Sequence, residues 1–95
     1  MGERCECGCG QIGTDNHHAL FGRQKRFPEL NAQENLVLVN HDQHIAGTFD
    51  TWEWRRYFWK VQCKRYGEEN MITWLEGLPA KLSGRVAEFR KMMEA

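Results

Sequence analysis

The sequence predicts an α+β domain with two short strands in its first half and helices in its second half. Two observations predict this class. Cysteine, glycine and histidine gather within residues 1–47, around two short segments typical of strands. Residues 48–95 carry apolar side chains at helical spacing between charged ones. A chain of 95 residues is the size of one domain, so we expect a single domain over 1–95 made of these two parts.

Composition excludes several classes of protein. A hydrophobic content of 41% with 12% aromatic residues is too high for a disordered chain, and no apolar run approaches the roughly 20 residues that span a bilayer. Basic and acidic residues number 13 each, so only a local patch can attract a polyanion. The charged start over 1–4 leads into cysteines and not into an apolar signal segment, so we expect a cytoplasmic protein.

The first half reads as strand, loop, strand and helix. A short strand is expected over 14–18, followed by a long surface loop over 20–34 that contains Gly22, Pro28 and Asn31. The apolar β-branched run over 36–39 predicts a buried strand, and a helix is expected over 41–46.

Three helices are predicted in the second half. Asp50 or Thr51 is a suitable N-cap for a helix that runs to Tyr66, and Gly67 ends it. A second helix is expected over 68–77, and a third begins near Ser83. The first of these helices carries two apolar stripes, so we expect it to be covered on two sides. Its stripes consist of Trp54, Tyr57, Phe58 and Val61, and of Trp52, Trp59, Cys63 and Tyr66.

The cysteines indicate a metal site. Cys5, Cys7 and Cys9 lie within five residues, which is too tight for easy disulfide geometry, and Cys63 is far away in the sequence. A structural metal would also add folding free energy to a domain with a small core.

A second group of polar residues could support chemistry. His17 and His18 are adjacent on a predicted strand and therefore point to opposite faces, so one can bind a divalent ion while the other accepts a proton from water. His44 can reach back from the following helix to complete the metal site. His41 and His44 share a helix face, and whether both bind the same ion is open at this point.

These residues resemble the HNH endonucleases of the ββα-metal fold. The similarity consists of the pair His17-His18 at the end of a strand, a long loop, Asn35 before an apolar strand, and His44 nine positions later. The phrase Asn-His-His-Ala-Leu-Phe-Gly-Arg over 16–23 resembles phage-type and prophage-type members. The resemblance covers roughly residues 5–47 and implies a ββα-metal core with a zinc knuckle, followed by C-terminal helices.

The resemblance implies a role for each matching residue. His17 and His44 would be ligands of one catalytic divalent ion, and His18 would be the general base that activates water. Asn35 would be the central asparagine of the catalytic site, which ties the loop to the hairpin and orients the base. The ion would be Mg²⁺, Mn²⁺, Ni²⁺ or Zn²⁺; the imidazole of His17, where many members have aspartate, favours the softer ions.

Many members of that family also hold a structural zinc with two Cys-x-x-Cys pairs. Asn40 and Gln43 stand at the positions of the second pair and are poor zinc ligands. The simplest replacement is a closed zinc site of four ligands. Its predicted ligands are Cys5, Cys7, Cys9 and His41, and a three-ligand site of Cys5, Cys9 and His41 is the alternative.

The implied substrate is DNA, with phosphates contacted by basic residues of the loop and of the first long helix. The predicted contacts are Arg23, Lys25, Arg26, Arg56 and Lys60. The competing interpretation of these residues is a solvated polar surface. Two other functions stay open: an inactive zinc-stabilised module that binds nucleic acid or protein, and a nuclease subunit of a larger phage or recombination complex. The sequence also leaves a homodimer open.

Overall fold

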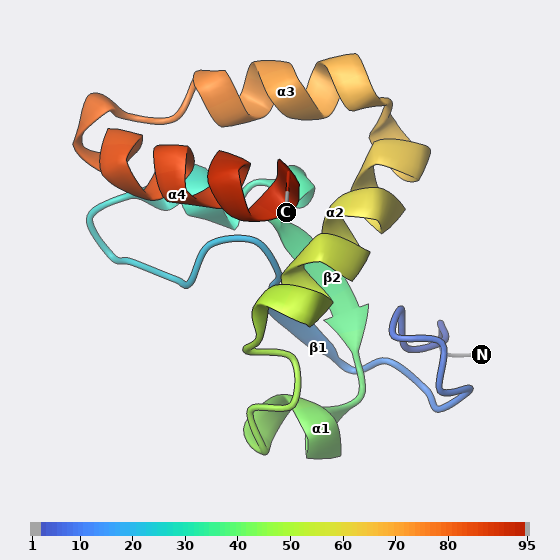
Figure 1. Cartoon of the computed structure of the whole chain (residues 1–95). Coiled ribbons are helices and arrows are strands. Elements are labelled where there is room, and N and C mark those ends of the chain that lie inside the picture. The colour runs from blue at the N-terminus through green and yellow to red at the C-terminus, as the bar shows by residue number, and fades with distance from the viewer. Residues whose placement is uncertain (1–2, 95) are drawn as a thin grey trace.

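A computed structural model describes residues 3–94; Met1, Gly2 and Ala95, at the ends of the predicted domain, lie outside the described residues. Within that part the chain forms a small α+β domain with four α-helices and one two-stranded antiparallel sheet, which confirms the predicted class (Figure 1). The elements are β1 (Asp15–His18), β2 (Leu36–Val39), α1 (His41–Ile45), α2 (Trp52–Tyr66), α3 (Glu68–Glu76) and α4 (Ser83–Glu94).

The hairpin of β1 and β2 pairs Asp15 with Val39 and His18 with Leu36. Side chains alternate between its two faces, as the period of a strand requires. His17 is buried on the same face as Val37, whereas His18 is only half-buried on the other face. The opposite orientations predicted for the two histidines are therefore confirmed.

The connection between the strands differs from the predicted surface loop. It contains two 3₁₀ turns, Pro28–Asn31 and Gln33–Asn35. Leu20, Phe21 and Leu30 are buried, and the Phe21 ring lies 5.0 Å from that of Phe89 on α4. This connection belongs to the core because its apolar residues fill the space between the hairpin and the C-terminal helices.

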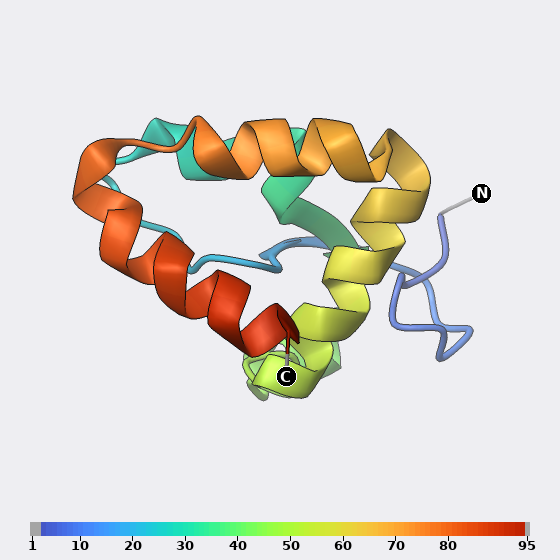
Figure 2. The ribbon, with the colours of Figure 1, turned by 45° about the horizontal axis from the view of Figure 1, so that its top comes forward.

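The predicted helix ends are confirmed in the second half. The Thr51 side chain accepts a hydrogen bond from the backbone N–H of Trp54 at the start of α2. Gly67 separates α2 from α3 at a φ of 93°, a backbone conformation that glycine adopts without steric cost. A turn connects α3 to α4. After this turn α4 runs back, so that its C-terminal end lies close to α2 (Figure 2).

Helix α2 is covered on two sides, as its apolar stripes predict. Phe58 is fully buried towards the hairpin, and Trp59 packs edge-on against Phe89 of α4 with ring centres 5.3 Å apart. Tyr57 of the first stripe is 42% exposed, and its ring packs edge-on against that of Phe58 with ring centres 5.6 Å apart. Gln62, one helical turn after Phe58, is fully buried.

Gln62 joins α2 to the chain that enters β2, and its replacement by leucine tests this connection. The buried Nε2 group donates to three backbone carbonyls, those of Gln33, Glu34 and Leu36, at 3.0–3.1 Å. Leucine has a similar size and no donor, so Gln62→Leu leaves these acceptors without that partner. We expect a loss of about 2–3 kcal/mol in the free energy of unfolding, measured by urea denaturation. Gln11→Leu, at an exposed position, is the control, and equal losses in both variants would refute this role.

No helix among residues 3–94 is both long and apolar enough to cross a membrane.

Candidate functional site

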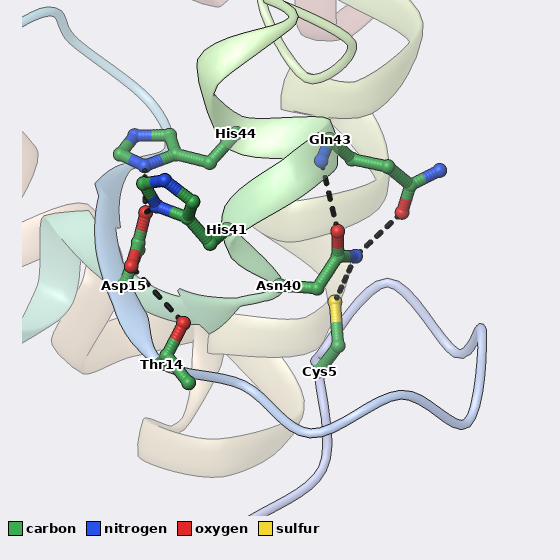
Figure 3. A network of polar contacts seen from close by, with 7 residues as sticks. All are labelled: Cys5, Thr14, Asp15, Asn40, His41, Gln43 and His44. Carbon is green, nitrogen blue, oxygen red and sulfur yellow. Dashed lines mark hydrogen bonds and ion pairs between the residues drawn. The ribbon is translucent and has the colours of Figure 1, made fainter.

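Helix α1 lies between two networks of polar contacts (Figure 3). One network joins His41 and His44 to β1, and the other joins Asn40 and Gln43 to the N-terminal cysteines. Residues three apart share a helix face, so His41 and His44 lie on one face of α1 and the pair Asn40 and Gln43 lies on another. The Asn40 side chain accepts a hydrogen bond from the Gln43 N–H and caps the helix. One short helix and its N-cap residue thus contribute side chains to both networks.

Asp15 organises the histidine network. One carboxylate oxygen of Asp15 lies 2.8 Å from Nδ1 of His41 and 2.9 Å from Nδ1 of His44. These hydrogen bonds from His44 and His41 lower the pKa of Asp15 to about 2, so its carboxylate is ionised at neutral pH. A neutral histidine that donates through Nδ1 carries its lone pair on Nε2. Asp15 therefore leaves Nε2 of His44 suited to bind a metal ion.

The ring of His17 packs against that of His44, at the edge of this network. The residue is 6% exposed, and its buried Nε2 atom has no partner among the described residues. Its ring centre lies 5.2 Å from that of His44 in an edge-on arrangement. Two imidazoles that bind one ion through nitrogen at about 2.0–2.1 Å have ring centres about 5 Å apart. Burial lowers the pKa of His17 to about 4, which keeps it neutral and able to offer a lone pair.

His18 lies at the end of β1 and contacts a different partner. Its Nε2 atom is 2.8 Å from the side-chain oxygen of Asn31 in the connection between the strands. Because an amide oxygen only accepts, Nε2 carries the hydrogen and the lone pair of the neutral ring is on Nδ1. The arrangement therefore gives His18 a fixed orientation and one basic nitrogen.

Asn35 is fully buried and fixes the chain that follows His18. Its side-chain oxygen accepts from the N–H groups of Leu20 and Phe21 at 2.9 and 3.0 Å, and its Nδ2 donates to the carbonyls of Phe21 and Leu30 at 2.9 and 2.8 Å. Its backbone carbonyl accepts from the N–H of Ala19 at 2.8 Å. Asn35 thus fixes the segment that directly follows His18. Through Leu30 it also fixes the turn that contains Asn31, the hydrogen-bond partner of His18.

The three N-terminal cysteines could hold a metal ion such as zinc. The sulfur atoms of Cys5, Cys7 and Cys9 all lie within 4.8 Å of one another, and the Cys5 and Cys7 sulfurs are 3.0 Å apart. Burial alone would raise the pKa of Cys5, but hydrogen bonds from Cys7 and Asn40 outweigh it and lower this pKa to about 7. Burial and the neighbouring Cys5 raise the pKa of Cys7 to about 12, so the contacts within the cluster favour the thiolate at Cys5. The thiolate is the form of cysteine that binds metals.

The structure does not place His41 with these cysteines. The His41 ring contacts Asp15 on the other side of α1, because positions 40 and 41 of a helix face different directions. Asn40 and Gln43 lie beside the sulfurs instead. The Asn40 Nδ2 group is 3.3 Å from the Cys5 sulfur, and the Gln43 side-chain oxygen is 3.6 Å from the Cys7 sulfur.

The basic residues predicted to contact DNA occupy two regions. The three loop residues, Arg23, Lys25 and Arg26, are exposed, and so is Lys60 on α2. Arg56 is half-buried and donates to the carbonyl of Met92 at 3.3 Å, so it joins α2 to α4. The loop residues follow His18 along the chain and lie outside the core.

Sequence reasoning did not assign Asp15 and Asn31 a role, although one signal for Asp15 was present. Residues two apart on a strand share a face, so Asp15 was certain to lie on the same side as His17. No sequence pattern predicted the contact between Asn31 and His18, because this contact depends on the path of the connection between the strands.

Comparison of the chain with protein-family models, with curated protein sequences and with solved structures found no match.

Proposed function

We propose that this chain is a metal-dependent nuclease of the HNH type that hydrolyses phosphodiester bonds in DNA. In this proposal β1, β2 and α1 form a ββα-metal core. The main support for it is the buried Nε2 atom of His17, which has no hydrogen-bond partner among residues 3–94 and belongs to a ring whose centre lies 5.2 Å from that of His44. A buried polar atom without a partner costs free energy, and a metal ion would remove that cost.

His17 and His44 would hold the ion through their Nε2 atoms, and Asp15 would keep His44 in the required orientation. When bound, the ion supplies a positive charge that stabilises the phosphate as negative charge develops on it. The donor set fits such an ion, because two imidazoles with a carboxylate behind one of them form a common arrangement at metal sites.

His18 would act as the general base. Its Nδ1 atom would take the proton of the attacking water, and the ring would then be positively charged. The hydrogen bond from Nε2 to Asn31 would stabilise that charged ring and prevent its rotation. Because His17 and His18 are adjacent, the ion and the base would act at the same end of β1.

Arg23, Lys25 and Arg26 would contact the DNA backbone. They are exposed in the segment that leaves β1 shortly after His18. Contacts of this kind position a phosphate chain and do not select a base sequence. We therefore expect weak sequence preference and binding that weakens as salt concentration rises.

Nicking of supercoiled plasmid by the purified chain tests the proposal. We expect nicking with at least one of Mg²⁺, Mn²⁺, Ni²⁺ and Zn²⁺, and its loss on addition of a chelator. His44→Ala removes a ligand and should abolish nicking, whereas Ile45→Ala, at a 69% exposed neighbouring position, should not. Absence of nicking by the folded protein in every metal would overturn the proposal and favour a zinc-stabilised binding module.

The role of Asp15 is tested by metal affinity. In Asp15→Asn one amide must contact two imidazole Nδ1 atoms, and the loss of charge weakens both hydrogen bonds. We expect Mn²⁺ to bind about 10–100-fold more weakly, measured by calorimetry, because partners behind a ligand commonly contribute that much. Asp42→Asn, on the exposed side of α1, makes the same change of charge and is the control. Equal affinities in both variants would show that Asp15 does not position the ligand.

A further inference from the structure

Among residues 3–94 the cysteine cluster brings together three ligand sulfurs, and the residues beside them offer a fourth ligand that the sequence does not suggest. Zinc in a structural site is almost always bound by four ligands in a tetrahedron. Cys5, Cys7 and Cys9 supply three sulfurs, and His41 contacts Asp15 on the far side of α1. Within the described part of the chain, the other side chains that hydrogen-bond to these sulfurs are those of Asn40 and Gln43.

The position of Gln43 fits that of a ligand. Its side-chain oxygen is 3.6 Å from the Cys7 sulfur. In a tetrahedral site with zinc–sulfur bonds of about 2.3 Å and a zinc–oxygen bond of about 2.1 Å, a sulfur and an oxygen ligand are about 3.6 Å apart. The Cys5 and Cys7 sulfurs, at 3.0 Å, would have to separate by less than about 1 Å to reach the spacing of two ligands.

Asn40 occupies the same region in another role. Its side-chain oxygen accepts from the N–H of Gln43 at 2.9 Å, so that oxygen is used to cap α1. Its Nδ2 group lies 3.3 Å from the Cys5 sulfur and 2.6 Å from the Gln43 side-chain oxygen (Figure 3). The same group lies 3.5 Å from the Cys9 sulfur. An N–H donor stabilises a thiolate and cannot bind a cation. Because the Asn40 Nδ2 group donates its hydrogen, the Gln43 atom that it contacts must be the amide oxygen. The contact with Asn40 therefore sets the orientation of the Gln43 amide.

We propose that the side-chain oxygen of Gln43 is the fourth ligand of a zinc ion bound by Cys5, Cys7 and Cys9. Asn40 supports this site by donating to the Cys5 and Cys9 thiolates. The inference goes beyond the proposed nuclease activity and does not depend on it. A neutral oxygen binds zinc more weakly than a fourth thiolate, so the site is weaker than one with four cysteines. Because Gln43 immediately precedes His44, zinc at this site also restrains the helix that carries a ligand of the other site.

X-ray absorption of the full chain loaded with one equivalent of zinc tests the ligand set. We expect three sulfurs and one oxygen around zinc in the wild type, without the outer-shell signal of an imidazole. Gln43→Cys should raise the sulfur count to four. An imidazole signal in the wild type that disappears in His41→Ala would overturn the proposal, and so would a sulfur count of three in a folded Gln43→Cys variant.

Competition with a chromophoric zinc chelator separates Gln43 from a water molecule as the source of the oxygen. We expect zinc affinity to fall in Gln43→Ala and to recover in Gln43→Glu, which restores an oxygen ligand. Gln11→Ala, an exposed position in the same N-terminal segment, should bind zinc as the wild type does. Equal affinity of the wild type and Gln43→Ala would overturn the proposal. Circular dichroism of each variant distinguishes loss of a ligand from loss of the fold.

Discussion

His18→Ala is expected to lower the rate of DNA nicking by about 10²–10⁴-fold, the range that a positioned general base contributes. The wild-type ring is held by Asn31 through Nε2, which leaves Nδ1 to accept the proton of water. Alanine removes that base and leaves the proposed ligands His17 and His44 in place. The fold and the affinity for Mn²⁺ are therefore expected to stay close to those of the wild type.

The measurement is the single-turnover nicking rate of a supercoiled plasmid, with thermal unfolding recorded for the same samples. Asn31→Ala is the companion variant: it keeps the base and removes only its hydrogen bond, so its rate should lie between those of His18→Ala and the wild type. A His18→Ala variant that nicks at the wild-type rate would exclude His18 as the base. A variant with a greatly lowered melting temperature would assign it a structural role.

Asn35→Ala is expected to have the largest effect on stability. The Asn35 side chain is fully buried and makes four hydrogen bonds with backbone groups of the connection between β1 and β2. Alanine leaves the N–H groups of Leu20 and Phe21 without this acceptor, at a cost of about 1–3 kcal/mol each. We therefore expect the free energy of unfolding to fall by roughly 2–6 kcal/mol, a large part of the stability of a domain this small.

Urea denaturation of Asn35→Ala measures this loss, and two further variants identify its cause. Asn16→Ala removes an exposed asparagine from β1 and should change stability by no more than about 0.5 kcal/mol. Asn35→Asp keeps the shape and the acceptor, but directs an oxygen at the carbonyls of Phe21 and Leu30, and should also destabilise. If Asn35→Ala unfolds at nearly the same urea concentration as Asn16→Ala, the buried amide does not hold this connection.

Local sequence patterns predicted most of the secondary structure. The β-branched run of β2, the N-cap Thr51 and the stop at Gly67 each act within a few residues, so they can be recognised without the rest of the chain. The opposite orientations of His17 and His18 follow from the period of a strand in the same way. The burial of Phe21 did not follow, because its partners on α3 and α4 are more than 50 residues away in sequence.

The candidate site shows the same division. By itself the sequence determined that three cysteines would lie together, since they are within five residues, and that His41 and His44 would share one helix face. Only the tertiary structure decided which side of α1 meets the cysteines. The N-terminal segment lies against the face of Asn40 and Gln43, and β1 brings Asp15 to the face of the histidines. The helical period sets the angle between these faces, but long-range packing chooses the neighbour of each.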